Sequence, residues 1–411
     1  MEVPMTASRA ARGFVAAKLF LVFILATIFS MPAHADAGFQ RWIRDFRSVA
    51  TSQGISGAVY DQAFRGITEP DPSVLEKARY QPEFRAEAWE YFDNRVQEAA
   101  IAEGRQKARE LKPWLDRIER QFGVSRYILL AIWSIESNYG AALKRDNVMK
   151  SLPQALATLA YADKRRSKFA RTQLIAALKI LQNGDVRPDQ LTSSWAGAMG
   201  HTQFIPTSYQ AYGVDMDGDG RRDIWNSEPD ALATAANLLR KNGWRSGETW
   251  GYEVLLPRGR KFPAGSMSLK RWGEIGVVRA NGKAYPDSSR NAELKVPDGR
   301  EGPSFLMTKN FFVIKRYNNS DKYALAVGLL ADAIQGVGGL VNDWNRPFQR
   351  LSFSETQELQ QRLGALGYYE GEIDGKIGGG SREAIRQFQA RMGLTQDGHP
   401  SKEVLQRLRG R

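Results

Sequence analysis

The segment AIWSIESNYG, residues 131–140, places one carboxylate at the end of an otherwise apolar helix. Burial of such a helix is expected to raise the pKa of Glu136, and the partial negative charge at a helix C-terminus acts in the same direction. A carboxylic acid that stays protonated near neutral pH can serve as the general acid that breaks a glycosidic bond. The alternative is an ordinary exposed glutamate at a helix end, and the physics of this segment alone favours neither.

Other catalytic schemes find little support in the sequence. The chain has no cysteine, which excludes thiol catalysis, and beyond its first 35 residues it has only His201 and His399. Two scattered histidines argue against a catalytic zinc site. A serine–histidine–aspartate triad is not excluded, but no nucleophile-elbow motif accompanies either histidine. Neither a phosphate-binding loop nor a dinucleotide fingerprint is present, so carboxylate chemistry remains.

Residues 1–35 are predicted to be a secretory signal peptide. Basic residues precede the apolar run Leu19–Phe29, and Ala33-His34-Ala35 follows as a small-x-small cleavage site. The run is shorter than the roughly 20 residues of a membrane span, although an uncleaved anchor is the alternative. Because no cysteine is available for a disulfide or for lipid attachment, we expect a soluble periplasmic protein without a stable membrane anchor.

The formal net charge of the whole chain is +13. A basic surface attracts polyanions, which outside the cytoplasm are the anionic cell wall and lipid headgroups. The signal peptide disfavours nucleic acid as the partner, and a nucleic-acid binder would require a cytosolic protein with salt-sensitive DNA binding.

The hydrophobic pattern predicts a mainly α-helical protein. Helices are expected over residues 36–120 with a loop near Tyr80–Phe84, then over Ser125–Asn138, and then over about 151–182, 230–244 and 319–343. Short runs separated by turn residues, from WGYEVLLP to NFFVIKRY, predict a small inserted β-sheet over about 246–316. Residues 346–353 are expected to be a linker, and 354–411 to form short helices around glycine-rich turns.

The segment SSWAGAMGHTQFIPTSY, residues 193–209, strongly resembles the signature S-x-A-G-A-M-G-x-x-Q-F-x-P-[ST]-S-Y of lytic murein transglycosylases of the membrane-bound B type. IESNYG resembles the helix end that carries the catalytic glutamate of that family, and QALATLAY and IKRYNNSDKYALAV resemble further family segments in the same order. The resemblance covers about residues 40–345. It implies a lysozyme-like helical domain that cleaves peptidoglycan between N-acetylmuramic acid and N-acetylglucosamine and produces 1,6-anhydro ends, with no catalytic cofactor.

The resemblance also implies roles for individual residues. Glu136 would act first as the acid and then as the base. The implied substrate-binding residues are Ser194, Met199, Gln203, Tyr317 and Asn318. For Gly197 and Gly200 we favour tight backbone packing over a direct catalytic role. The family prototype is lipid-anchored through a cysteine that this chain lacks.

The loop DMDGDGRRDIWN, residues 215–226, has the spacing of a calcium-binding loop. Its last position is Asn226 where such loops carry a bidentate glutamate, and a late acidic residue would replace that ligand, as in the B-type family. The predicted ligands of a structural calcium ion are Asp215, Asp217, Asp219, Arg221 through its carbonyl oxygen, Asp223 and Asp230. A metal-free turn rich in aspartate and glycine is the alternative.

The C-terminal segment, which contains LGYYEGEIDGKIGGGSREAIRQFQARMGL, resembles a small three-helix peptidoglycan-binding module. The predicted organisation is therefore a signal peptide (1–35), a catalytic region (36–345), a linker (346–353) and a peptidoglycan-binding domain (354–411). The expected partners are peptidoglycan glycan strands and other cell-wall enzymes. Two functions compete with the transglycosylase: a hydrolytic muramidase, and a catalytically silent scaffold that binds the wall.

Overall fold

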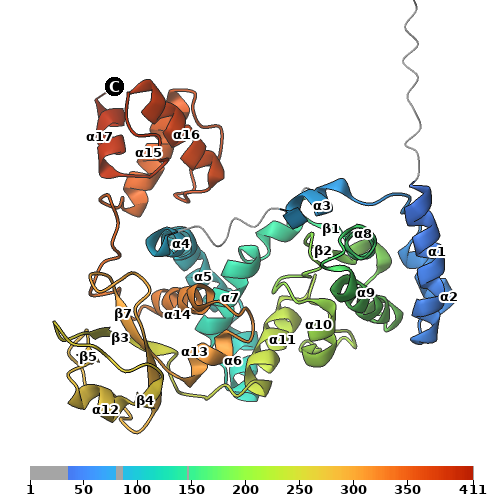
Figure 1. Cartoon of the computed structure of the whole chain (residues 1–411), viewed down its shortest axis with the longest axis horizontal. Helices are drawn as coiled ribbons and strands as arrows, with labels where there is room; N and C mark the ends of the chain where they lie inside the picture. The colour runs from blue at the N-terminus through green and yellow to red at the C-terminus, as the bar shows by residue number, and fades with distance from the viewer. Residues whose placement is uncertain (1–35, 80–86, 146–147, 411) are drawn as a thin grey trace, which may run out of the picture.

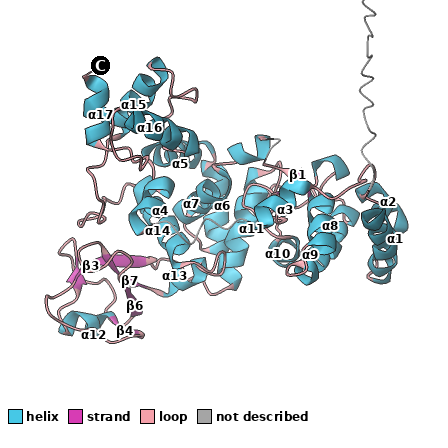
Figure 2. Ribbon diagram, turned by 45° about the horizontal axis from the view of Figure 1, so that its top comes forward, coloured by secondary structure: helices cyan, strands magenta, loops and turns pink. Residues whose placement is uncertain are grey.

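The computed structural model describes residues 36–79, 87–145 and 148–410. The predicted signal peptide and the loop predicted at Tyr80–Phe84 therefore lie outside the described residues. Figure 1 shows a helical body that runs from α1 and α2 at one end to a small β-sheet at the other, with α15–α17 as a separate helical unit. Figure 2 shows that helices dominate every part except this sheet. No helix among the described residues combines the length and apolar character that crossing a membrane requires.

The helical body is built from thirteen helices among the described residues. The first are α1 (Ala37–Ser52), α2 (Gly57–Ala63), α3 (Pro72–Arg79), α4 (Ala88–Arg95), α5 (Glu98–Glu110) and α6 (Lys112–Phe122). The others are α7 (Arg126–Ser137), α8 (Leu152–Ala162), α9 (Ser167–Gln182), α10 (Pro206–Tyr212), α11 (Glu228–Lys241), α13 (Lys309–Ile314) and α14 (Asp321–Gln335). Two short strands, β1 (Lys150–Ser151) and β2 (Thr192–Ser193), pair antiparallel between them.

Side-chain caps start several of these helices where the sequence predicts. Ser125 accepts a hydrogen bond from the backbone N–H of Tyr127 and starts α7, as expected from its position before the apolar run. The block predicted over 151–182 is divided into α8 and α9. The break lies at Asp163, whose carboxylate accepts the backbone N–H groups of Arg165 and Arg166 and so replaces helical hydrogen bonds.

The core of the helical body surrounds α7. Every residue from Ile128 to Ser134 is buried, and α7 packs against α14, α5 and α11. A helix that is apolar on nearly all sides must be enclosed by other elements, so α7 forms the centre of the fold.

The sheet has five antiparallel strands in the order β4-β6-β7-β3-β5. They are β3 (Gly251–Leu255), β4 (Ser266–Ser268), β5 (Val278–Arg279), β6 (Asn291–Lys295) and β7 (Ser304–Met307), with α12 (Leu269–Glu274) after β4. Trp272 is fully buried at the centre of a separate small core on this sheet. The prediction of a strand in NFFVIKRY is wrong, because this segment begins with α13. Its run Phe311–Ile314 packs in the main core, and a short apolar run does not distinguish a buried helix from a strand.

The C-terminal unit consists of α15 (Phe353–Ala365), α16 (Gly379–Arg391) and α17 (Lys402–Arg409) around its own core. A capping box between Ser352 and Glu355 starts α15. The segment 346–353, expected to be a linker, is held against the helical body. The Arg346 guanidinium pairs with Asp93 at 2.6 Å, and the ring of Phe348 packs against Trp89.

Candidate active site

A left-handed turn explains why α7 ends just after Glu136. Asn138, Tyr139 and Gly140 have φ values of 50°, 52° and 87°. A non-glycine residue rarely adopts this region, and successive left-handed residues cannot continue a right-handed helix. Glu136 therefore stands in the last turn of α7, at the point where the buried helix reaches the surface of the core.

Hydrogen bonds to a second loop fix this turn. The Ser137 hydroxyl donates to the carbonyl oxygen of His201 at 2.6 Å and accepts the backbone N–H of Gly140 at 3.0 Å. Trp133 Nε1 donates to His201 Nδ1 at 3.0 Å. Burial lowers the pKa of His201 to about 4, so the imidazole is neutral at pH 7 and able to accept this bond. The end of α7 is thus attached to residues 194–204, the loop that carries the glycine-rich signature.

The Glu136 carboxylate is half-buried and accepts a hydrogen bond from Tyr323 of α14. The distance between the Tyr323 hydroxyl and Glu136 Oε1 is 2.6 Å. Burial, followed by the charge of Glu136, raises the pKa of Tyr323 well above its usual value, which keeps this hydroxyl protonated as a donor. The ring of Tyr317 stacks on that of Tyr323 with centroids 6.4 Å apart, and its hydroxyl donates to the Thr202 carbonyl oxygen.

Glu136 faces a cavity of about 670 Å³. One wall is formed by α4 and α5, another by the end of α7, and a third by the segment Lys376–Gly379 of the C-terminal unit with Arg382. Arg382 links the walls, because it donates to Asn94 at 2.9 Å and pairs with Glu90 at 3.7 Å. Among the described residues that line this cavity, Glu136 is the only carboxylate.

The structure places the predicted substrate-binding residues in two groups. Ser194, Met199 and Gln203 lie on the signature loop, where Met199 is fully buried and Gln203 adopts a left-handed φ of 51°. Tyr317 lies beside Tyr323, whereas the adjacent Asn318 is exposed. The side chains of Ser194 and Gln203 bond within the loop itself, to the backbone N–H of Ala198 and the carbonyl oxygen of Gly200.

Close packing explains the signature glycine at position 200. Gly200 has a φ of 65°, and a Cβ atom there would lie 2.3 Å from the carbonyl oxygen of Ile224. This observation agrees with the packing role expected for Gly200. Tyr323 was not predicted from the sequence as a site residue, although it follows Tyr317 by six positions. Two signals point to Tyr323: it belongs to the family-like segment IKRYNNSDKYALAV, and it lies in the first turn of α14, after the N-cap Ser320.

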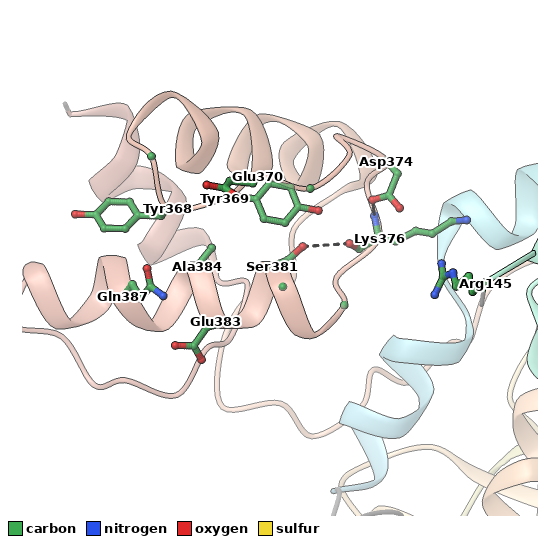
Figure 3. Close-up of a pocket in the computed structure, with 14 residues that line it drawn as sticks. Arg145, Tyr368, Tyr369, Glu370, Asp374, Lys376, Ser381, Glu383, Ala384 and Gln387 are labelled. Atoms are coloured by element: carbon green, nitrogen blue, oxygen red, sulfur yellow. Dashed lines mark hydrogen bonds between the residues drawn. The ribbon is translucent and has the colours of Figure 1, made fainter. Parts of the chain in front are cut away.

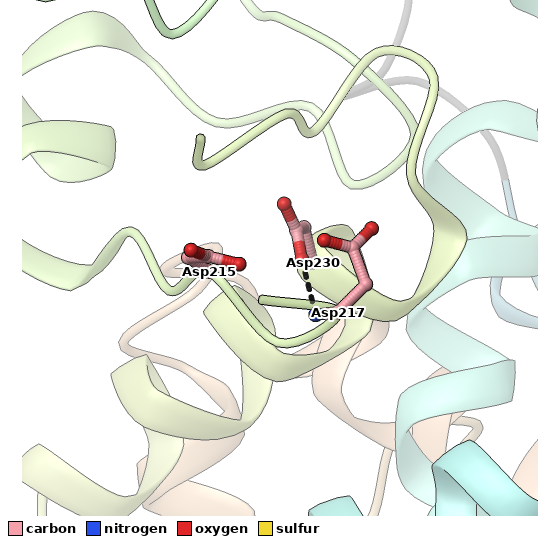
Figure 4. A group of neighbouring side chains, drawn as sticks. All are labelled: Asp215, Asp217 and Asp230. Carbon is pink, nitrogen blue, oxygen red and sulfur yellow. Dashed lines mark hydrogen bonds between the residues drawn. The ribbon is translucent and has the colours of Figure 1, made fainter. Parts of the chain in front are cut away.

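The acidic loop gathers three of the predicted metal ligands. Figure 4 shows Asp215, Asp217 and Asp230 together, and one carboxylate oxygen of each lies within 4.8 Å of the others. Asp230 accepts the backbone N–H groups of Met216, Asp217 and Asp223, and burial raises its pKa to about 6. Three neighbouring carboxylate oxygens form a donor set that suits a hard cation such as calcium.

The other predicted ligands make different contacts. The Asp219 carboxylate accepts the backbone N–H of Arg221 at 2.8 Å. The Asp223 carboxylate accepts the backbone N–H groups of Trp225 and Asn226, both at 2.9 Å. The structure therefore brings Asp215, Asp217 and Asp230 together, and the carboxylates of all five aspartates also accept backbone N–H groups of the loop.

A second cavity, of about 690 Å³, lies on the C-terminal unit. Figure 3 shows Tyr368, Tyr369 and Glu370 along it, with Arg145 of the helical body approaching from the other side. Asp374 Oδ1 accepts the backbone N–H of Lys376 and the amide of Gln360. These bonds give Asp374 a structural role in the turn that precedes α16.

Residues 38–332 match the family model of the transglycosylase SLT domain, and residues 354–408 match that of the putative peptidoglycan binding domain. The chain belongs to the transglycosylase SLT family. The family resemblance read from residues 40–345 and the mainly helical, lysozyme-like fold are both confirmed.

One sequence relative and two proteins of known structure are similar to this chain. The chain is 30% identical over 224 residues to membrane-bound lytic murein transglycosylase B of Escherichia coli (strain K12), a match that spans 54% of this chain and 60% of the relative. Crystal structures of SltB3 from Pseudomonas aeruginosa, in complex with NAG-NAM-pentapeptide and with NAG-anhNAM-pentapeptide, share 43% identity and a TM-score of 0.71, covering 90% of this chain and 99% of theirs. The Escherichia coli lytic transglycosylase Slt35 in complex with calcium has 25% identity and a TM-score of 0.60, covering 73% of this chain and 93% of its own.

Proposed function

We propose that the protein is a lytic transglycosylase that cleaves the β-1,4 bond between N-acetylmuramic acid and N-acetylglucosamine in peptidoglycan. The observation that carries the proposal is the cavity in which Glu136 is the only carboxylate among the described lining residues. Ordinary glycosidases need two carboxyl groups flanking the bond, whereas intramolecular ring closure needs one group that changes role. The family membership and the ligands of SltB3, one of which contains the anhydro sugar, support the same reaction.

In the proposed mechanism, protonated Glu136 gives its proton to the glycosidic oxygen as the bond to C1 of N-acetylmuramic acid breaks. The 2-acetamido group of that sugar supports the developing positive charge at C1. The Glu136 carboxylate then removes the proton of the C6 hydroxyl, whose oxygen bonds to C1 and closes the 1,6-anhydro ring. Glu136 ends the cycle protonated, and no water is consumed. The Tyr323 hydroxyl holds one carboxylate oxygen at 2.6 Å and so fixes the orientation of the group that transfers the proton.

The test is digestion of purified peptidoglycan by the wild-type protein and by Glu136→Gln, with mass spectrometry of the soluble products. The exposed Glu98→Gln, at the start of α5, is the matched control. We expect anhydro-muramyl ends from the wild type and the control, and none from Glu136→Gln. Hydrated reducing ends would instead identify a hydrolytic muramidase. Wall binding without products from any of the three proteins would identify a scaffold.

The substrate contacts follow from the same proposal. Tyr317, beside Tyr323, and the signature loop with Ser194, Met199 and Gln203 are proposed to bind the sugars, together with Asn318. The exposed Asn318 has an amide available for a ligand, whereas buried Met199 acts through the shape of the loop.

We also propose that Asp215, Asp217 and Asp230 hold a calcium ion, which the Slt35 structure with calcium supports. Ligation by Asp219, by Asp223 and by the Arg221 carbonyl oxygen stays a prediction. The ion would stabilise the loop between α10 and α11. No step of the proposed mechanism passes through it.

The domain boundaries proposed from the sequence are 36–345 for the catalytic region, with the β-rich insertion at about 246–316, and 354–411 for the peptidoglycan-binding domain. The binding domain is proposed to hold the enzyme on its polymer, which raises the local concentration of substrate. Removal of residues 1–35 would release the mature protein in the periplasm, where peptidoglycan is its partner.

A further inference from the structure

The corner between α8 and α9 carries a dense positive charge. The eleven residues from Tyr161 to Arg171 contain five basic side chains and one acidic side chain, in a chain whose total formal charge is +13. The single carboxylate, Asp163, is already paired with Arg166 at 2.6 Å. Among the described residues, no carboxylate lies within ion-pair distance of Lys164, Arg165 or Lys168. These three exposed cations are therefore available to an external anion.

Two large aromatic side chains are exposed beside these cations. Phe169 is 42% exposed and Tyr161 is 37% exposed. Arg171, also exposed, lies over the ring of Trp42 of α1 at 5.3 Å, and the ring of Tyr161 contacts that of Phe39 at 5.4 Å, so α1 extends the same surface. We call Tyr161, Lys164, Arg165, Lys168, Phe169 and Arg171 the α8–α9 patch.

The position of the patch separates it from the proposed catalytic cavity. Figures 1 and 2 both place α1, α8 and α9 at the end of the molecule opposite to the sheet and to α15–α17. None of the patch residues lines either cavity described above. A partner bound at the patch would therefore leave Glu136 and the C-terminal unit accessible.

We infer that the α8–α9 patch docks the protein reversibly on the surface of a bilayer that contains anionic phospholipid. The cations complement the negative headgroups, and Phe169 and Tyr161 place apolar rings at the depth where headgroups meet acyl chains. A bilayer surface uses both the cations and the phenyl ring of Phe169, whereas a sugar polymer would engage that ring only by stacking, and the test separates the two. Since no described helix can cross a membrane, the docking is peripheral and depends on salt.

The test is co-sedimentation of the full protein with phosphatidylcholine vesicles that either contain or lack phosphatidylglycerol. We expect binding only to the vesicles with phosphatidylglycerol, and weaker binding as salt rises. Lys164→Gln/Arg165→Gln should lower the partition coefficient about 30-fold, which corresponds to about 2 kcal/mol for two basic residues at an anionic surface. Phe169→Ala should lower it about fivefold through the lost insertion of a partly exposed ring.

The matched control is Arg258→Gln/Lys261→Gln, which also removes one arginine and one lysine charge, but from an exposed loop between β3 and β4. The control should bind vesicles within about threefold of the wild type. Both double variants should digest soluble glycan at the wild-type rate.

Equal loss of vesicle binding in the two double variants would overturn the inference, because net charge alone would then explain it. Failure of the wild type to bind the anionic vesicles would overturn it as well. So would patch-dependent binding to insoluble peptidoglycan in place of vesicles, which would identify the wall polymer as the partner.

Discussion

Removal of one hydroxyl group, in Tyr323→Phe, tests how Glu136 is held. Tyr323 is 3% exposed, so it acts on the substrate only through Glu136. The substitution keeps the ring, its stacking on Tyr317 and its packing in the core. The single loss is the hydrogen bond of 2.6 Å to Glu136 Oε1.

The structure sets the size of the effect. A hydrogen bond to a charged group contributes about 1.5–3 kcal/mol. If this bond orients the carboxylate during proton transfer, its loss lowers kcat by about 10- to 150-fold. KM should change little, because no contact with the sugars is removed.

The assay is the initial rate of anhydro-muropeptide release from soluble glycan strands, followed by liquid chromatography and mass spectrometry over a range of substrate concentrations. Tyr285→Phe is the control, because it removes a similar hydroxyl bond, 2.9 Å to the Val277 carbonyl oxygen, in the sheet subdomain. Thermal denaturation of both variants verifies that they are folded. A kcat of Tyr323→Phe within twofold of the wild type would refute the positioning role. A higher KM at unchanged kcat would instead show that Tyr323 contributes to substrate binding.

Three further predictions concern stability. Asp332 accepts the indole N–H of Trp250, and burial raises the pKa of its carboxyl group to about 7. The native state therefore holds a proton that the unfolded state releases, and the protein loses stability as pH rises from about 4 to 7. In urea denaturation, Asp332→Asn should be more stable than the wild type by up to about 4 kcal/mol at pH 8 and equal to it at pH 4. Burial lowers the pKa of His201 to about 4, so the stability that the neutral imidazole contributes is complete above pH 6.5 and is lost as pH falls toward 4. Between these pH values, the free energy of unfolding of His201→Asn, in which a shorter side chain accepts the bond from Trp133, should fall by up to about 3 kcal/mol less than that of the wild type. An equal fall in the variant and the wild type would contradict this prediction. Calcium at about 100 times its Kd, added to chelator-treated protein, should raise Tm by roughly 5 °C, and Asp217→Asn should reduce that rise; an equal response to magnesium would argue against a calcium-selective site.

Local patterns in the sequence predicted α7 correctly, and the structure places Glu136 in its last turn. The N-cap Ser125 and the length of the apolar run after it favour a buried helix, and the change to Ser137, Asn138 and Gly140 marks its end. The sheet was also predictable, because turn residues separate its strands. The structure of Phe311–Ile314 was not predictable, because four consecutive apolar residues fit a buried strand and a buried helix equally.

Contacts between distant segments were beyond the reach of the sequence. The bond from Tyr323 to Glu136 joins residues 187 positions apart, and no local spacing encodes it. Counting positions in the acidic loop predicted Asp219 and Asp223 as ligands. The structure gathers Asp215, Asp217 and Asp230 within 4.8 Å of one another, and the ligation of Asp219 and Asp223 stays a prediction.

The bond between Tyr323 and Glu136 also determines when, during synthesis and export of the chain, the candidate site is complete. The candidate site needs α7, the signature loop and the first turn of α14, so it is assembled from three segments that leave a ribosome or a translocation channel one after another. A chain that has emerged only as far as residue 320 contains Glu136 but not the hydroxyl that orients it. The proposed activity is therefore expected to stay low until α14 has followed α7 and the signature loop and has packed against α7.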